Sequence, residues 1–239
     1  MNEKKQSGLI LIGVSIIAGL FILGFFMNQS VKTFKGYDRT VTVRGLAEQE
    51  HLANLIIWPV QFTVASNNQQ EIYKMLEDNV ERVTLFLKER GIIEEEISVD
   101  LPVVTDRSAQ RWGGENGGQF RYVASQAVTV YSERVEDVRE VMRNAGELGK
   151  KGVIISGGDY SLRTEYLFTR LNEIKPEMIE AATKEARKVA EKFAEDSNSE
   201  LGKIKTASQG LFSISDRDRN NPHIKNVRVV STIEYYLSD

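Results

Sequence analysis

The chain contains no cysteine. Disulfide bonds, thiolate metal sites, cysteine nucleophiles and a lipid on an N-terminal cysteine are therefore excluded. Histidine is almost as scarce, since His51 and His223 are the only two in 239 residues. Neither belongs to an HxxxH pair or another ligand-spaced cluster, and no GxSxG motif accompanies them. We therefore expect no enzymatic activity, no bound cofactor and no metal ion.

The chain also lacks an excess of positive charge. Its net charge is −3. Residues 1–39 contain five basic and two acidic side chains, so the rest of the chain contains 26 basic and 32 acidic ones. Nucleic-acid binding requires clustered positive charge. The sequence therefore predicts no nucleic-acid partner.

Long apolar runs are absent except near the N-terminus, where Gly8–Met27 reads GLILIGVSIIAGLFILGFFM without a charged residue. A helix of these 20 residues would be about 30 Å long, which matches the hydrocarbon thickness of a bilayer. A cleaved signal peptide usually has a shorter apolar region and a small-residue cleavage site, and residues 28–31 are a weak site. We therefore expect an uncleaved single-pass anchor, preceded by a cytoplasmic tail (residues 1–7) and followed by a connector (residues 28–39).

The charges that flank this segment do not decide its orientation. Lys4 and Lys5 precede it, while Lys32, Lys35 and Arg39 follow it. A short N-terminal tail before a long C-terminal domain is the usual signal-anchor arrangement. We therefore expect the chain in the inner (cytoplasmic) membrane, with its domain facing the periplasm or the cell exterior.

Hydrophobic periodicity divides residues 40–239 into strands and helices. Pro59 cannot donate to a ladder, so we expect a sheet edge or a bulge there. Ser66 or Asn67 is expected to cap the first helix, and Gly91 to end it. In chain order, the predicted elements are strands 40–44 and 51–65, helix 69–90, strands 97–105 and 120–131, helix 135–148, strand 152–168 broken at Gly157-Gly158, helix 175–198, and strands 203–213 and 225–237.

The helix predicted over residues 175–198 has Pro176 in its first turn, where a missing N–H is tolerated. Its expected apolar stripe is Met178, Ala182, Val189 and Phe193, beside a face of alanines. We expect the alanine face to pack on the chain's own sheet, because tertiary packing usually stabilises an amphipathic helix. Packing against another subunit is the alternative.

The order of predicted elements occurs twice. Residues 51–131 read strand–helix–strand–strand, residues 152–237 read the same way, and the helix over 135–148 joins them. No clear repeat of residues accompanies this architecture. The sequence predicts an α+β domain over residues 40–239, with two such halves and helices packed on mixed sheets.

Five segments resemble a known family in their order and spacing: VTVRGLAE (41–48), WPVQFTV (58–64), RYVASQAVTVY (121–131), EAATKEARKVAEKFAE (180–195) and LGKIKTASQG (201–210). Over about residues 40–238 the chain resembles the SIMPL-domain family of bacterial envelope proteins. The resemblance implies an envelope domain. Some members are linked to oxidative-stress tolerance, and at least one forms a large ring-like, channel-shaped oligomer. The family has no catalytic motif to carry over, and residues 196–200 depart from its more apolar helix end.

The polar loop over residues 106–119 contains the unusual stretch RWGGENGG. Its glycines are reminiscent of a phosphate loop, but the Lys-Ser/Thr ending and the strand-to-helix context are missing. Trp112 at an exposed tip is costly without a partner, and aromatic residues are favoured interface anchors. Arg111 and Trp112 are therefore the candidate interaction residues. A flexible hairpin tip without a contact role is the alternative.

A second loop partly imitates a calcium site. Asp216, Asp218 and Asn220 match its first three ligands, but Asn221 and Val227 replace the glycine and glutamate that complete it. We expect a solvated loop, in which two arginines that alternate with the acids neutralise them.

The sequence is best interpreted as a membrane-anchored, non-enzymatic, oligomerising envelope protein with a scaffold or adaptor role. Its expected partners are the membrane, further copies of the chain and an envelope protein. The alternative is a periplasmic module that binds a small molecule or peptide in a cleft between the two halves. A hydrolase is the weakest interpretation, because only two histidines could serve as its base.

Overall fold

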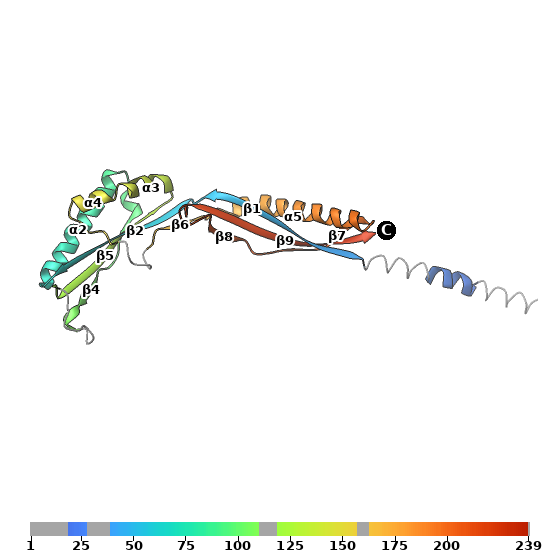
Figure 1. Cartoon of the computed structure of the whole chain (residues 1–239), viewed down its shortest axis with the longest axis horizontal. Coiled ribbons are helices and arrows are strands. Elements are labelled where there is room, and N and C mark those ends of the chain that lie inside the picture. Colours follow the sequence, from blue (N-terminus) through green and yellow to red (C-terminus); the bar gives the residue numbers. More distant parts are fainter. Residues whose placement is uncertain (1–18, 28–38, 110–118, 157–162, 239) are drawn as a thin grey trace, which may run out of the picture. The chain divides into compact units, whose positions relative to one another are not determined.

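The computed structural model describes residues 19–27, 39–109, 119–156 and 163–238 (Figure 1). The chain forms two compact units. The first unit comprises Met1–Gln49, Ile174–Ser213 and Arg228–Asp239, and the second unit comprises Glu50–Glu173 and Ile214–Val227. Among the described residues no helix is long and apolar enough to cross a membrane. Of the predicted anchor, only residues 19–27 are described, and they are helical.

An antiparallel sheet organises the second unit. Its strand order is β3-β5-β2-β6, and β4 also pairs with β5. Three helices belong to the same unit. The apolar side chains of the sheet and of these helices form the larger hydrophobic core, which includes Phe62 of β2 and Ile72 and Phe86 of α2. The elements are β2 (Leu55–Ser66), α2 (Gln69–Glu89), β3 (Ile97–Val99), β4 (Val103–Asp106), β5 (Tyr122–Ser132), α3 (Val135–Arg143), α4 (Gly146–Lys150) and β6 (Glu165–Leu167).

Helix α2 begins at Gln69 as predicted, but its capping residue differs from the predicted ones. The side chain of Asn68 accepts a hydrogen bond from the Gln70 N–H at 2.9 Å, so Asn68 is the cap and the prediction of Ser66 or Asn67 is wrong. Ser66 instead accepts the Asn68 N–H at 3.1 Å and donates to the Glu71 carboxylate. Gly91 has φ +85°, the left-handed conformation expected after a helix end, which confirms that prediction.

Pro59 pairs with Thr129 of β5 on one side of β2. On the other side β6 covers only Leu55–Ile57, and a single bridge joins Phe62 to Ile155. Within the described residues β2 thus has a partner on one side only at Pro59, and its register with β5 is continuous there, so the strand has no bulge at this position.

Several predicted boundaries are wrong. His51 and Leu52 end the preceding strand, the strand over 97–105 divides into β3 and β4, and the helix over 135–148 divides into α3 and α4. The long strand over 152–168 reduces to the bridge at Ile155 and to β6, while its predicted break at Gly157-Gly158 lies outside the described residues. The strands predicted over 97–105 and 152–168 are shorter than expected because a strand forms only where its backbone pairs with another strand.

The sheet of the first unit has the order β1-β9-β7, with β8 also paired to β9. Helix α5 lies along this sheet (Figure 1). The pairing of β7 with β9 is antiparallel, with register shifts between Leu201 and Thr206. The sheets are antiparallel, so the predicted mixed sheets are wrong while the α+β class is confirmed. The elements are β1 (Thr40–Leu52), α5 (Leu171–Asp196), β7 (Glu200–Gln209), β8 (Ser213–Asp216) and β9 (Ile224–Ser238).

Helix α5 buries a narrower stripe than predicted. Its buried residues are spaced four apart: Met178, Ala182, Ala186, Ala190 and Ala194. Ala186 and Ala190 pack with Val43, Ile233 and Tyr235 of the sheet, which confirms that the alanine face packs on the chain's own sheet. The helix begins at Leu171, so Pro176 lies inside it rather than in its first turn.

Two residues of the predicted stripe of α5 lie outside this contact. Val189 is 40% exposed and Phe193 is 56% exposed. From Ala182 to Ala194 the buried positions of the helix are all alanines, and the larger Val189 and Phe193 turn away from the sheet.

The two predicted halves correspond to the two sheets, with one exchange. In each unit a helix packs on a sheet in which one strand pairs with three others, β5 in one sheet and β9 in the other. The predicted first strand of the second half, β6, pairs with β2 instead, and β1 takes the place beside β9.

Candidate functional site

The candidate interaction residues Arg111 and Trp112 lie outside the described residues. The structure does describe the base of their loop. Arg121 Nη2 lies 2.9 Å from the Asp106 carboxylate, which also accepts from Ser108. The hydrogen bonds from Arg121, and then from Ser108, hold the pKa of Asp106 well below its usual value. The two ends of the loop are therefore tied together by charge.

Both histidines lie against aromatic rings. The ring centre of His51 is 5.1 Å from that of Phe168, and that of His223 is 6.0 Å from that of Tyr166. Burial, helped by the positive charge of Arg139, lowers the pKa of His223. The described residues contain no group of three or more His, Cys, Asp or Glu side chains that could hold a metal ion.

The loop that imitates a calcium site uses its acids for other bonds. Asp218 accepts hydrogen bonds from the backbone N–H groups of Asn220 (2.8 Å) and Asn221 (2.9 Å) and from Arg217 Nε (3.0 Å). The side-chain hydrogen bond from Asn221, followed by that from Arg217, lowers the pKa of Asp218 to about 2. Arg217 thus neutralises Asp218 as predicted, but Asp216 pairs with Lys225 rather than with an arginine.

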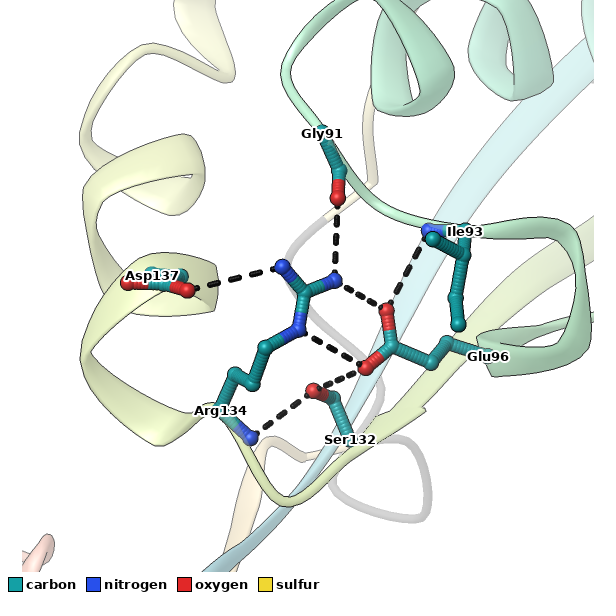
Figure 2. A network of polar contacts seen from close by, with 6 residues as sticks. All are labelled: Gly91, Ile93, Glu96, Ser132, Arg134 and Asp137. Carbon is teal, nitrogen blue, oxygen red and sulfur yellow. Dashed lines mark hydrogen bonds and ion pairs between the residues drawn. The ribbon is translucent and has the colours of Figure 1, made fainter.

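A polar network that the sequence did not reveal surrounds Glu96 (Figure 2). Arg134 Nη2 donates to Glu96 Oε2 at 2.5 Å and to the Gly91 carbonyl at 2.9 Å. The Ser132 hydroxyl (2.6 Å) and the Ile93 N–H (3.2 Å) also donate to the Glu96 carboxylate. These bonds connect the end of α2, the short 3-10 helix Glu94–Glu96, β5 and the start of α3. Since both oxygens of Glu96 are occupied, the network fastens these elements together.

A cavity of about 450 Å³ lies in the second unit. Asp78, Asn79 and Arg82 of α2 line it, together with Thr63 of β2 and the segment around Ile154. Sequence reasoning missed this site, although a signal was present. Asn79 is three residues after Leu76 and four before Val83, so a polar side chain occupies a position of the apolar stripe.

Among the residues that the structure describes, β7 pairs with a strand on one side only, so the first unit has an open sheet edge there. Every residue from 202 to 209 is exposed, and Leu211, just after the strand, is 95% exposed. Lys203 and Lys205 and the register shifts protect the first half of this edge. The second half, residues 206–209, pairs regularly with β9 and carries no charge. It therefore offers a regular, uncharged edge to which another strand can add.

A comparison with protein families gives one match, over residues 41–230, to the profile described as "SIMPL: Protein of unknown function (DUF541)". The matched range covers more than half of the chain and extends into both sheets, although β9 continues beyond it to Ser238. No curated protein matches the chain.

Proposed function

The chain belongs to the SIMPL family, and we propose that it is a membrane-anchored envelope protein that acts by assembling with further copies of itself. Its role in this proposal is that of a scaffold or adaptor rather than an enzyme. The observation that carries the proposal is the open edge at residues 206–209 of β7, followed by exposed Leu211.

An unpaired edge presents a row of backbone N–H and C=O groups to which another strand can add. In the first unit, β1 and β7 are the two ends of the same strand order. Pairing β7 of one copy with β1 of the next would extend the sheet through unlike surfaces. Such head-to-tail contacts repeat until they close into a ring or continue as a filament. This geometry supports an assembly of copies of the chain.

The membrane anchor is supported by the charge-free segment Gly8–Met27. In the part of this segment that the structure describes, residues 20–23 and 25–27 are large apolar residues whose side chains are exposed. A surface of this kind is stable in a bilayer and costly in water. The proposed location is the inner membrane, with the two units on its outer side.

A non-catalytic role is supported by the way the described polar clusters are used. The carboxylates of Glu96, Asp106 and Asp218 each accept several hydrogen bonds that fix a turn or join elements. A catalytic acid or base must instead be within reach of a substrate.

Sedimentation velocity of the full chain in detergent, at about 20 μM, tests the assembly. We expect a particle larger than a monomer. Leu211→Glu should weaken association at least tenfold, because it places a charge beside the edge. The matched control is Leu101→Glu, since Leu101 is 89% exposed and lies in the second unit. A monomer for the unmodified chain refutes self-association, and equal effects of both variants remove the β7 edge from it.

A further inference from the structure

We propose that the cavity lined by Asp78, Asn79 and Arg82 binds a small zwitterion that carries an apolar group, namely a free apolar amino acid. The three polar side chains project from one turn of α2. Asp78 supplies a negative charge and Arg82 a positive charge, and the Asn79 amide can both donate and accept hydrogen bonds.

Asn79 is the first observation. The residue is 6% exposed and lines the cavity, and its amide makes no hydrogen bond to any residue that the structure describes, although it is not a fully buried group. An amide in a largely buried position is usually paired with protein, water or another molecule. An apolar side chain would suit this stripe position better. The amide is therefore explained if the cavity holds a polar molecule that pairs with it.

The charges beside Asn79 are the second observation. Asp78 is half-buried, and within the described parts of the chain its carboxylate has no ion pair or hydrogen bond. Arg82 Nη1 donates to the Lys151 carbonyl at 3.2 Å, which positions the guanidinium without neutralising it. Asp78 and Arg82 form no ion pair with each other, although i, i+4 pairs commonly do. Each charge therefore remains available to a ligand.

A zwitterion matches both charges at once. The ammonium group of an amino acid would pair with Asp78 and its carboxylate with Arg82, while the Asn79 amide can bond to either. A simple amine would leave Arg82 unpaired, and a simple anion would meet the negative charge of Asp78. A ligand with both groups avoids either cost.

Apart from Thr63, the remaining side chains of the wall are apolar and include those of Val64, Met75, Phe120 and Ile154. Its volume of about 450 Å³ falls within the range of small-molecule sites. The far wall is also held in place, because the Thr63 N–H donates to the Ile154 carbonyl at 3.3 Å and the Ser156 N–H to the Gln61 carbonyl at 2.9 Å. An aliphatic or aromatic side chain would gain contact there without reorganising the site.

Titration of the full chain in detergent with L-leucine, followed by calorimetry, tests this site. We expect saturable binding in the millimolar range or tighter. Isopentylamine, which lacks the carboxylate, and isocaproate, which lacks the amine, should each bind at least tenfold more weakly. The titration is repeated with valine, isoleucine, methionine and phenylalanine. If neither leucine nor any of these four amino acids gives a heat of binding at about 10 mM, the cavity holds water only and the proposal is overturned.

Variants assign the binding to this cavity. Asp78→Asn and Arg82→Gln should each lower the affinity at least tenfold, while Glu77→Gln and Lys74→Gln, exposed on the same helix and outside the cavity, should not change it. Asn79→Leu should abolish binding and raise the midpoint of thermal unfolding, because it replaces an amide that has no protein partner with an apolar side chain on the apolar stripe of α2. Unchanged affinity in both charge variants would place the binding elsewhere and overturn the assignment, whether or not Asn79→Leu folds.

Discussion

Gly45 of β1 lies directly against the backbone of α5 at Ala182. A Cβ atom built on Gly45 would be 1.8 Å from the Ala182 carbonyl oxygen and 2.9 Å from the Ala186 Cβ. Real Cβ atoms do not approach other atoms so closely. The absence of a side chain at Gly45 therefore lets the helix come close to the sheet, and the closeness explains why alanines fill the contact.

Gly45→Ala should destabilise the protein by about 1–3 kcal/mol or more, because helix α5 must move away from the sheet. Urea unfolding of the full chain in detergent measures this change. The matched control is Gly149→Ala in α4, where nothing lies within 4 Å of the added Cβ. The control should be neutral or stabilising by about 0.5 kcal/mol. Equal midpoints for Gly45→Ala and the unmodified chain would contradict the close contact.

The Glu96 network should make stability depend on acid. Burial raises the pKa of Glu96, but the hydrogen bonds from Arg134, Ser132 and the Ile93 N–H outweigh it, so the pKa lies below the usual 4.5. A carboxylate with a lowered folded-state pKa contributes stability that is fully present above its unfolded-state value. That contribution is lost as the pH falls through the folded-state pKa. Stability should therefore decline below pH 4.5.

Glu96→Gln tests this dependence. The variant should be less stable than the unmodified chain near neutral pH, because the charge-assisted hydrogen bonds to Arg134 are lost. The difference should shrink as the pH falls below 4.5. Glu95→Gln at the exposed neighbouring position is the control and should follow the unmodified chain. A difference that stays constant from neutral to acidic pH would mean that Glu96 does not act through its charge.

The anchor predicts a single span with the N-terminus in the cytoplasm. A reporter that is active only outside the cytoplasm, fused after Asp239, should be active. A second fusion with a reporter active only in the cytoplasm should be silent. The opposite pair of results would reverse the proposed orientation.

The loop that contains Arg111 and Trp112 remains a predicted contact between copies. Trp112→Ala should weaken association by about 2 kcal/mol, as truncation of an aromatic interface anchor commonly does. Asn116→Ala in the same loop is the control and should have little effect. Sedimentation profiles that are identical for the unmodified chain and Trp112→Ala would remove this loop from the assembly while leaving the β7 edge as its basis.

Local patterns in the sequence determined helix α2 of the second unit. The stripe of Ile72, Leu76 and Val83 and the glycine at position 91 predict α2 nearly to its ends, and the structure confirms it. These features depend on residues within one or two turns of each other, so periodicity is enough to find them. The same periodicity also predicts Val80 on the apolar stripe, but Val80 is only half-buried whereas its neighbour Asn79 is buried. Which of two adjacent side chains is buried depends on the angle at which the helix meets its sheet.

The sequence by itself determined the family, the α+β class, the helices of the two halves and the apolar segment near the N-terminus. Tertiary structure decided which strands pair: β1 joins β9, from the far end of the chain, while β6 joins β2. It also decided that Ala186 and Ala190, rather than Val189 and Phe193, face the sheet. Both outcomes depend on contacts between residues more than a hundred positions apart, such as Gly45 with Ala182. Local periodicity carries no information about such contacts, because it reports only which residues share one face of their own element.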